Sequence, residues 1–167
     1  MDGSIVQGPG KPASVRLIVD FMCGKLARWL RVLGVDAEYY GETESTKLLK
    51  RALNEERTVV TRNTRIPSAY SVEVLLVKSE IPEEQIVQVI KDLHLEHRLA
   101  PFTRCNVCNV ELNDVEKDDV KEKVPLYVFQ TQGRFKMCGS CGRIYWPGTH
   151  TRSMKAYIDR ILEASNE

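Results

Sequence analysis

Two Cys-x-x-Cys pairs, Cys105 with Cys108 and Cys138 with Cys141, constrain this chain more than any other feature of its sequence. Paired thiolates at this spacing are typical ligands of a closed, tetrahedral Zn²⁺ site. Gly142 follows the second pair, and glycine readily takes the left-handed backbone that turns amide groups toward thiolate sulfur. The spacing therefore predicts that Cys105, Cys108, Cys138 and Cys141 hold one structural zinc ion.

The segment between the two pairs is 29 residues long, which is enough for two hairpin arms, and Val124–Val128 and Arg134–Met137 are predicted as strands. Two other uses of the cysteines stay open at this point: a pair of disulfides, or redox chemistry at one pair. The sequence shows no secretory signal, so we expect a cytoplasmic protein and favour zinc. Cys23, the fifth cysteine, falls near the apolar side of a predicted helix and is expected to be a small core residue.

Length and charge narrow the possible functions. The 167 residues, 43% of them hydrophobic, are enough for one ordinary core and a small metal-held module. No run approaches the roughly 18 apolar residues of a membrane span, so we expect no membrane partner. With 24 basic and 23 acidic residues the net charge is +1, so any affinity for nucleic acid must come from local clusters of cations. The sequence does not indicate an oligomeric state.

Alternating strand and helix patterns predict the architecture of the first part of the chain. Short apolar runs predict strands, and apolar residues that recur every three to four positions predict helices. Strands are expected at Val15–Asp20, Val35–Tyr40, Thr58–Thr61 and Val72–Val77, and helices at Met22–Leu33, Thr46–Glu55 and from Pro82 onward. This alternation predicts an α/β domain in which a mostly parallel sheet carries helices on both faces.

The chain divides into three predicted parts. Residues 1–14, rich in glycine and proline, are expected to form a disordered leader. Residues 15–98 hold the α/β domain. Residues 99–167 hold the zinc module, which ends in a helix at about Ser153–Leu162.

Polar residues follow the predicted strands at the edge where open α/β sheets bind ligands. Asp20 ends the first strand, Glu42 and Glu44 follow the second, and Asn63 follows the third. A carboxylate at the end of an apolar strand is costly to bury unless it is hydrogen-bonded, paired or bound to a metal. The spacing leaves two interpretations of Asp20 equally open: a functional carboxylate, or the N-cap of the following helix.

Basic residues form a stripe on the first predicted helix. At about 100° per residue, Lys25, Arg28 and Arg31 fall opposite the apolar arc. Arg62 and Arg65, at and after the end of the third strand, are expected to extend this stripe, although arginines are also common in loops. Cations in these positions can hold an RNA backbone while nearby carboxylates hold a divalent ion. An ordinary solvated helix face would show the same pattern, so the spacing alone does not decide between the two.

Three motifs together resemble those of the PIN-like RNase domain family named after the C-terminal half of the mutator-seven exonuclease. Residues 18–31 (IVDFMCGKLARWLR) are similar to its opening motif, and residues 61–63 (TRN) are similar to its Thr-Arg-Asp motif. Arg104 with Cys105, and residues 145–150 (YWPGTH), resemble its zinc-ribbon signature. The resemblance covers about residues 16–155, with the motifs in the order found in the family.

The resemblance implies a PIN-like fold followed by a zinc ribbon. It also implies a ribonuclease in which strand-end carboxylates hold Mg²⁺ or Mn²⁺, and the ion activates water against a phosphodiester. The family ends its third strand with aspartate where this chain has Asn63, and it carries aspartates after the second strand where this chain has glutamates. The implied catalytic set is Asp20, Glu44, Glu42 and Asn63, and the implied RNA-binding set is Lys25, Arg28, Arg31 and Arg62.

Three functions stay open on these residues. The first is a divalent-metal ribonuclease, which Asn63 would weaken because Mg²⁺ relies on carboxylate charge. The second is a non-catalytic RNA-binding or ribosome-associated zinc-ribbon protein. The third is a protein-interaction adaptor that works through its ribbon.

Overall fold

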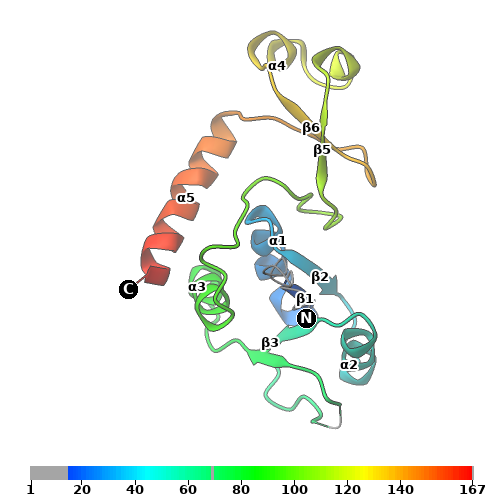
Figure 1. The fold of residues 1–167 in the computed structure, drawn as a ribbon, viewed down its shortest axis with the longest axis vertical. Coiled ribbons are helices and arrows are strands. Elements are labelled where there is room, and N and C mark those ends of the chain that lie inside the picture. The colour runs from blue at the N-terminus through cyan, green and yellow to red at the C-terminus, as the bar shows by residue number, and fades with distance from the viewer. Residues whose placement is uncertain (1–14, 69, 167) are drawn as a thin grey trace, which may run out of the picture.

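Two units build the structure, a larger α/β unit and a small antiparallel ribbon (Figure 1). The computed structural model describes residues 15–68 and 70–166, so the expected disordered leader, residues 1–14, lies outside the described residues. Four parallel strands in the order β2-β1-β3-β4 form the larger sheet. These strands are β1 (Arg16–Asp20), β2 (Asp36–Tyr40), β3 (Thr58–Thr61) and β4 (Val74–Leu76).

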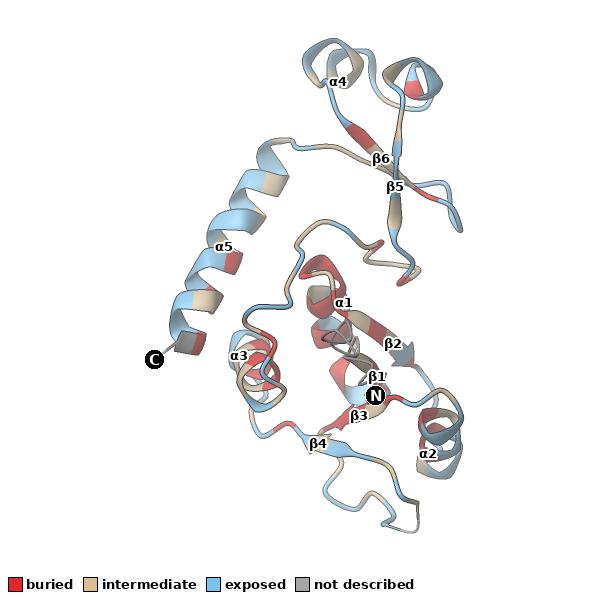
Figure 2. Ribbon diagram, viewed as in Figure 1, coloured by how far each residue is buried: buried red, intermediate tan, exposed pale blue. Residues whose placement is uncertain are grey.

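Helices cover both faces of the larger sheet. Leu17 and Val19 of β1 belong to the core that the sheet forms with α1 and α3, whereas Ile18 faces the opposite side and packs with α2. All three side chains are fully buried, and Figure 2 shows the buried residues concentrated around β1, β3 and α1. The predicted α/β fold is therefore confirmed. Its helical segments are η1 (Phe21–Cys23, a 3₁₀ turn), α1 (Gly24–Val32), α2 (Ser45–Asn54) and α3 (Pro82–Asp92).

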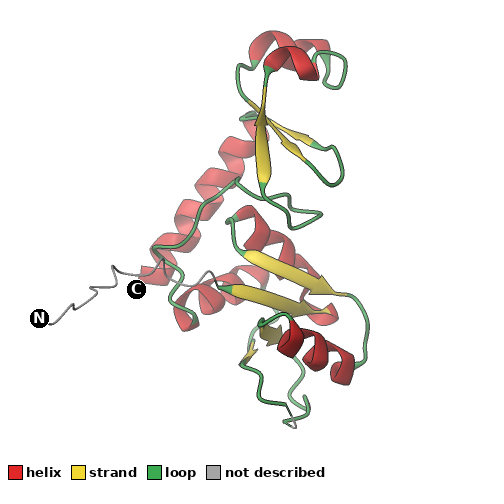
Figure 3. Ribbon diagram, turned by 45° about the vertical axis from the view of Figure 1, so that its right-hand side comes forward, coloured by secondary structure: helices red, strands yellow, loops and turns green. Residues whose placement is uncertain are grey.

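The C-terminal helix α5 (Thr149–Asn166) returns from the ribbon to the α/β unit (Figure 3). Ile158 and Ile161 belong to the same buried cluster as the apolar residues of α1 and α3. The ring of Tyr157 lies 4.5 Å from that of Trp29 on α1. Burial, with help from Glu83, raises the pKa of Tyr157 to about 12. The position of α5 in the sequence predicted that this helix belongs to the zinc module. In the structure its apolar face completes the core of the α/β unit.

The connection between the two units depends on a glycine at the end of α1. Gly34 has a φ of +86°, and a Cβ at this position would lie 2.2 Å from the carbonyl oxygen of Ala100. The amides of Ala100 and Phe102 donate to the carbonyls of Leu33 and Val32 at 3.0 and 2.9 Å. Only glycine combines this backbone conformation with so close an approach. The connecting segment is therefore held against the end of α1.

The ribbon is a three-stranded antiparallel sheet in the order β5-β6-β7. The strand predicted at Arg134–Met137 is confirmed as β6. The strand predicted at Val124–Val128 is wrong, because α4 occupies this segment. Pro125 immediately precedes α4; proline lacks the N–H that a strand ladder needs, and its fixed φ suits the start of a helix. The elements of the ribbon are β5 (Leu112–Val115), η2 (Lys117–Val120), α4 (Leu126–Thr131), β6 (Phe135–Cys138) and β7 (Ile144–Tyr145).

Within residues 15–68 and 70–166, no helix has the length and apolar character needed to cross a membrane.

Candidate metal centre and candidate RNase site

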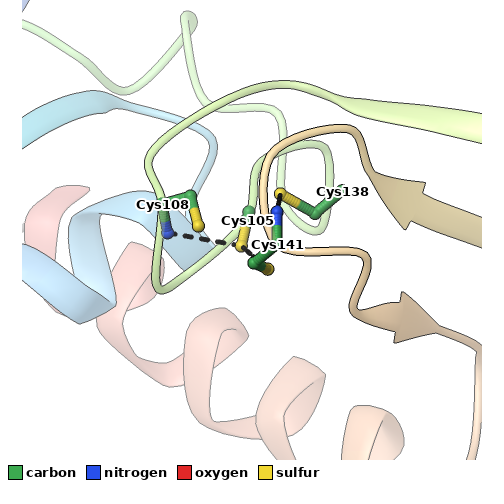
Figure 4. A group of neighbouring side chains, drawn as sticks. All are labelled: Cys105, Cys108, Cys138 and Cys141. Atoms are coloured by element: carbon green, nitrogen blue, oxygen red, sulfur yellow. Dashed lines mark hydrogen bonds between the residues drawn. The ribbon is translucent and has the colours of Figure 1, made fainter.

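The sulfur atoms of Cys105, Cys108, Cys138 and Cys141 gather in one place (Figure 4). All four lie within 4.8 Å of one another, and Cys105 Sγ is 3.9 Å from Cys141 Sγ. Zinc–sulfur bonds of about 2.3 Å in a tetrahedron put the sulfur atoms about 3.8 Å apart. A disulfide needs about 2.05 Å, and all five cysteines are free. The disulfide alternative is therefore wrong, and the four thiolates can bind one metal ion such as zinc.

Each cysteine pair is closed by the same local turn. In both pairs the amide of the second cysteine donates to the sulfur of the first, at 3.3 and 3.4 Å. The residue after each pair has a positive φ, 64° at Asn109 and 71° at Gly142. The left-handed conformation predicted at Gly142 is confirmed. Asn109 fills the same place in the first turn, because asparagine tolerates this region better than most side chains do.

The surroundings of Cys105 favour its thiolate form. Burial raises the pKa of Cys105, but hydrogen bonds from the Tyr145 hydroxyl and from the amides of Cys108 and Val107 outweigh burial and lower this pKa to about 6. Burial and the neighbouring Cys105 raise the pKa of Tyr145, so its hydroxyl keeps the proton that it donates. The two side chains are 3.1 Å apart. Because the thiolate is the form of cysteine that binds metals, the site is prepared for a cation.

Asn109 fastens the first cysteine pair to the edge of the larger sheet. Its Oδ1 accepts from the amide of Ala37 at 3.0 Å, and its Nδ2 donates to Asp36 at 2.8 Å and to Glu38 at 3.3 Å. These partners lie on β2, the outer strand of the sheet. An edge strand presents unpaired backbone groups, and Asn109 satisfies one of them. Sequence reasoning missed this residue, although its place directly after a cysteine pair was an available signal.

Arg31 completes this contact from α1. It is 6% exposed, its Nε donates to the carbonyl of Ala37, and its Nη1 donates to the carbonyl of Val107, both at 2.7 Å. Burial lowers the pKa of Arg31, although the negative charges of Glu38 and the nearby cysteines oppose the shift. The prediction that Arg31 belongs to an exposed RNA-binding stripe is therefore wrong. Helical periodicity placed it away from the core of its own unit, and the ribbon covers that side.

Replacing Arg31 by methionine is expected to weaken zinc binding by about 10- to 100-fold, the loss typical when an outer contact of a metal site is removed. The carbonyls of Ala37 and Val107 lose their donor while much of the side-chain volume remains. Competition with a chromogenic zinc chelator measures the affinity. Arg28→Met on the same helix is the matched control, because Arg28 is exposed. Equal affinity in both variants would show that Arg31 does not support the metal centre.

Asp20 lies at the carboxyl end of β1 and is 3% exposed. One carboxylate oxygen accepts from the amide of Met22 at 2.7 Å, and the other accepts from the hydroxyl of Thr61 at 2.5 Å. The first bond caps η1, so the capping interpretation of Asp20 is confirmed. Each oxygen keeps a further lone pair, because an ionised carboxyl group has about four acceptor sites. The side chain is fixed in place and still has acceptor capacity.

Thr61 connects Asp20 with Asn63. The Thr61 hydroxyl donates to Asp20 and accepts from the amide of Asn63 at 2.9 Å. Asn63 Nδ2 donates to Ser45 Oγ at 3.3 Å, and Asn63 Oδ1 accepts from the amide of Arg65 at 2.9 Å. One hydrogen-bonded path therefore runs from the end of β1, across the end of β3, to the first residue of α2. Sequence reasoning missed the roles of Thr61 and Ser45; a hydroxyl at a strand end was the available signal.

Glu42 and Glu44 lie between β2 and α2, and both are exposed. Glu44 pairs with Lys47 at 2.9 Å, and the Tyr40 hydroxyl is 3.5 Å from Glu42. Within the part of the chain that the structure describes, the cysteines form the one group of three or more His, Cys, Asp or Glu side chains spaced to share a metal ion. The four predicted catalytic side chains are therefore brought together only in part, with Asp20 linked to Asn63 and the glutamates apart.

The predicted RNA-binding cations have different surroundings. Lys25 and Arg28 are exposed on α1, and neither forms a hydrogen bond or an ion pair with another described residue. Arg62 is partly buried and bonded to Glu80 at 2.5 Å. Because Arg31 is buried in the contact with the ribbon, the exposed basic stripe on α1 is shorter than predicted and consists of Lys25 and Arg28. Its two members on α1 lie one helical turn apart.

Both units of the chain fall within the match to one known protein family. The profile described as Mut7-C RNAse domain matches residues 15–158. The chain belongs to the Mut7-C RNase domain family. No curated protein and no solved structure matches it. The match runs from the start of the α/β unit into α5, so both units and both candidate sites lie within it.

In this Mut7-C RNase domain the two sites are formed to different degrees. The cysteine site holds four sulfur atoms within 4.8 Å of one another, close enough to share one metal ion. The carboxyl edge of the larger sheet has one fixed carboxylate, Asp20, and one neutral oxygen donor linked to it, Asn63. Glu42 and Glu44, which precede α2, are exposed.

Proposed function

We propose that this protein is a divalent-metal-dependent ribonuclease that cuts RNA at the carboxyl edge of its larger sheet. One observation carries the proposal: in a chain of an RNase family, Asp20 is buried at the end of the central strand β1 and held there by Thr61. A carboxylate fixed in this way is a suitable ligand for Mg²⁺ or Mn²⁺, which prefer oxygen donors.

Asn63 is proposed as a neutral oxygen donor beside Asp20. Its Oδ1 accepts one hydrogen bond, from Arg65, and an amide oxygen has two lone pairs. The bond from its Nδ2 to Ser45 orients the amide. Asn63 thus offers an oriented oxygen but no negative charge, so the remaining charge of the site must come from other side chains.

Glu44, followed by Glu42, is proposed to supply that charge. Glu44 directly precedes Ser45, the residue that Asn63 contacts, and among the described residues its side chain pairs with the exposed Lys47 alone. The ion pair raises the pKa of Lys47 but leaves both groups in water, and exposed pairs of this kind contribute little to stability. Glu44 is therefore free to exchange Lys47 for a cation at the sheet edge.

The chain's own residues account for positioning and charge in this reaction. A bound divalent ion supplies a water of lowered pKa and neutralises charge on the phosphate. Thr61 holds the Asp20 carboxylate in one orientation. Lys25 and Arg28 are proposed to contact phosphates of the RNA strand, since both are exposed and lie one and two turns after Asp20.

We also propose that the ion at the four cysteines is zinc and that its role is structural. Four sulfur ligands complete a tetrahedral site and leave no position for water or substrate. The contacts of Asn109 and Arg31 then fix the ribbon on β2. Free thiols persist in the reducing cytoplasm, where we place the protein.

A second function, RNA binding without cleavage, is favoured by one specific observation. Asn63 carries no charge, and the side chains of Glu42 and Glu44 are bonded elsewhere than to Asp20. A protein with this edge and an exposed pair of cations could bind RNA without holding a divalent ion. The two functions predict different outcomes in a single assay.

The assay uses zinc-loaded protein and a labelled single-stranded RNA, with and without added Mn²⁺ or Mg²⁺. We expect cleavage only when the divalent ion is added. Omission of the ion is the proper control, because a chelator would also remove zinc from the cysteines. RNA that is bound but stays intact would favour the binding function. RNA that is neither cut nor bound would exclude both.

A further inference from the structure

We infer that an open pocket in the ribbon binds one nucleotide of single-stranded RNA at a place separate from Asp20. The inference rests on the proposed function only in that its ligand is the proposed substrate. The pocket, called the ribbon pocket below, has a volume of about 480 Å³ and is lined by Asn106, Lys123 and residues 142–146. Pockets that bind small ligands typically have volumes of ~300–1,000 Å³.

Trp146 supplies a stacking surface in the ribbon pocket. Its ring is half-buried and lies 6.5 Å from the ring of Phe135, which supports it from within the ribbon. A Cβ at Gly148 would lie 3.3 Å from Trp146 Nε1, so this glycine keeps space beside the indole. Among the described residues the indole N–H has no hydrogen-bond acceptor, although buried tryptophans usually find one. A nucleotide offers a flat base for stacking and acceptor oxygens on its ribose and phosphate.

Two cations at the ribbon pocket have no counter-ion. Lys123 and Arg143 are exposed, and neither forms an ion pair or a side-chain hydrogen bond with another described residue. Elsewhere in the ribbon, Lys136 pairs with Asp114 and Lys117 lies over the ring of Phe129. Because the whole chain has a net charge of only +1, two uncompensated cations at one concave site favour an anionic ligand.

The remaining wall gives the pocket a hydrogen-bonding amide. One polar atom of the Asn106 side-chain amide lies 3.1 Å from the Tyr145 hydroxyl, and its other polar atom has no hydrogen-bond partner in the described chain. An amide group beside an aromatic ring and two cations matches the base and phosphate of one nucleotide. An acidic peptide would satisfy the cations but would leave the ring and the amide unused. A base paired in a duplex could not stack on Trp146, so the expected ligand is single-stranded.

The test follows binding instead of cleavage, so that it does not depend on the RNase reaction. Full-length zinc-loaded protein carrying Asp20→Asn is titrated with a short oligouridylate without added divalent ion. The chain has two tryptophans, Trp29 and Trp146, so Trp29→Phe leaves Trp146 as the only tryptophan reporter. We expect saturable quenching of its fluorescence. Variants at Trp146 lack this reporter, so their binding is followed by the fluorescence anisotropy of a labelled oligouridylate. Trp146→Ala should weaken binding about 5- to 150-fold, and Trp146→Phe should restore most of it.

Charge is tested with a double variant that leaves the aromatic wall intact. Lys123→Ala with Arg143→Ala should weaken binding and reduce the slope of log K against log salt by about 1.4, since each phosphate contact to a single strand contributes ~0.7. Lys50→Ala with Lys155→Ala is the control, because both lysines are exposed and lie on α2 and α5. An unchanged slope in the first variant, or no quenching of Trp146, would overturn the inference.

Competitors distinguish the ligand class. A short polyglutamate that displaces the RNA from the pocket as well as oligouridylate does would show an acidic-peptide site and reject the inference. Equal affinity for oligothymidylate would reject RNA as the specific ligand. Failure of Mn²⁺-dependent cleavage by protein that retains Asp20, with Trp146 quenching still present, would reject the proposed RNase reaction and leave the ribbon pocket supported.

Discussion

Replacing Cys138 by alanine is expected to abolish stable zinc binding and to unfold the ribbon, while the larger sheet stays folded. Structural zinc contributes on the order of 10–16 kcal/mol of apparent binding free energy in small metal-held modules. The ribbon has little else to hold it, because its buried apolar side chains in the described chain, apart from the cysteines, are Val120 and Phe135. Elemental analysis should find about one zinc per wild-type chain and almost none in the variant.

Amide hydrogen exchange measures which part of the Cys138→Ala variant unfolds. The amide of Ala37 donates to Asn109, next to the first cysteine pair, so its protection should fall together with that of β6. Cys23→Ala is the matched control, because Cys23 lies in the core of the α/β unit. That variant should keep both its zinc and the protection of Ala37. A Cys138→Ala protein that keeps its protection in β6 without zinc would contradict the structural role of the metal.

Replacing Asp20 by asparagine is expected to reduce RNA cleavage on the order of 100- to 1,000-fold, the loss typical when one group that stabilises a transition state is removed. The fold should change little, because asparagine caps helices about as well as aspartate does. Single-turnover cleavage with added Mn²⁺ measures the effect. Asp159→Asn, on the exposed side of α5, is the matched control. Equal rates in the two variants would remove Asp20 from the reaction.

Asn63 is linked to Asp20 through Thr61, and adding a carboxylate at Asn63 is expected to strengthen metal-dependent cleavage. Asn63→Asp adds a carboxylate next to Thr61 and introduces the residue that the resemblance to the family implies at this position. The variant should reach half-maximal cleavage at a lower Mn²⁺ concentration, because these ions rely on carboxylate charge. An unchanged or higher Mn²⁺ requirement would contradict the placement of Asn63 beside the ion.

Local patterns were enough to predict the α/β unit, because its strands and helices bury apolar residues at regular intervals on both faces of the sheet. β3 has the predicted bounds, Thr58–Thr61, and the predicted starts of β1 and α2 differ from the structure by one residue. The left-handed turn at Gly142 also follows from residues close in sequence. Where neighbouring residues decide the conformation, periodicity and turn chemistry identify it.

The features that sequence reasoning missed depend on contacts between distant segments. Arg31 lies opposite the apolar arc of its helix, and periodicity within one helix contains no information about the ribbon that covers it. Asn109 acts through β2, more than 70 positions earlier, and no local pattern predicts that pairing. The segment at Val124–Val128 has strand-like composition, but Pro125 starts a helix there instead.

The candidate RNase site also combines features that local sequence predicts with features that only the fold determines. Asp20 could be identified from its place at the end of an apolar strand. Its bond to Thr61 requires the pairing of β1 with β3, which appears only in the fold. The side-chain directions of Glu42 and Glu44 are not encoded in spacing, because both residues are exposed and their rotamers depend on bound partners.

Binding of Mn²⁺, followed by electron paramagnetic resonance, is the decisive measurement for the proposed site. Zinc-loaded protein is titrated with Mn²⁺ in the presence of a short RNA, and the signal of RNA alone is subtracted. We predict about one bound Mn²⁺ per wild-type chain, the single ion that a site built on Asp20 would hold, and loss of this binding in Asp20→Asn. Equal Mn²⁺ binding by the two proteins, or none by the wild type, would contradict a metal-dependent RNase centred on Asp20.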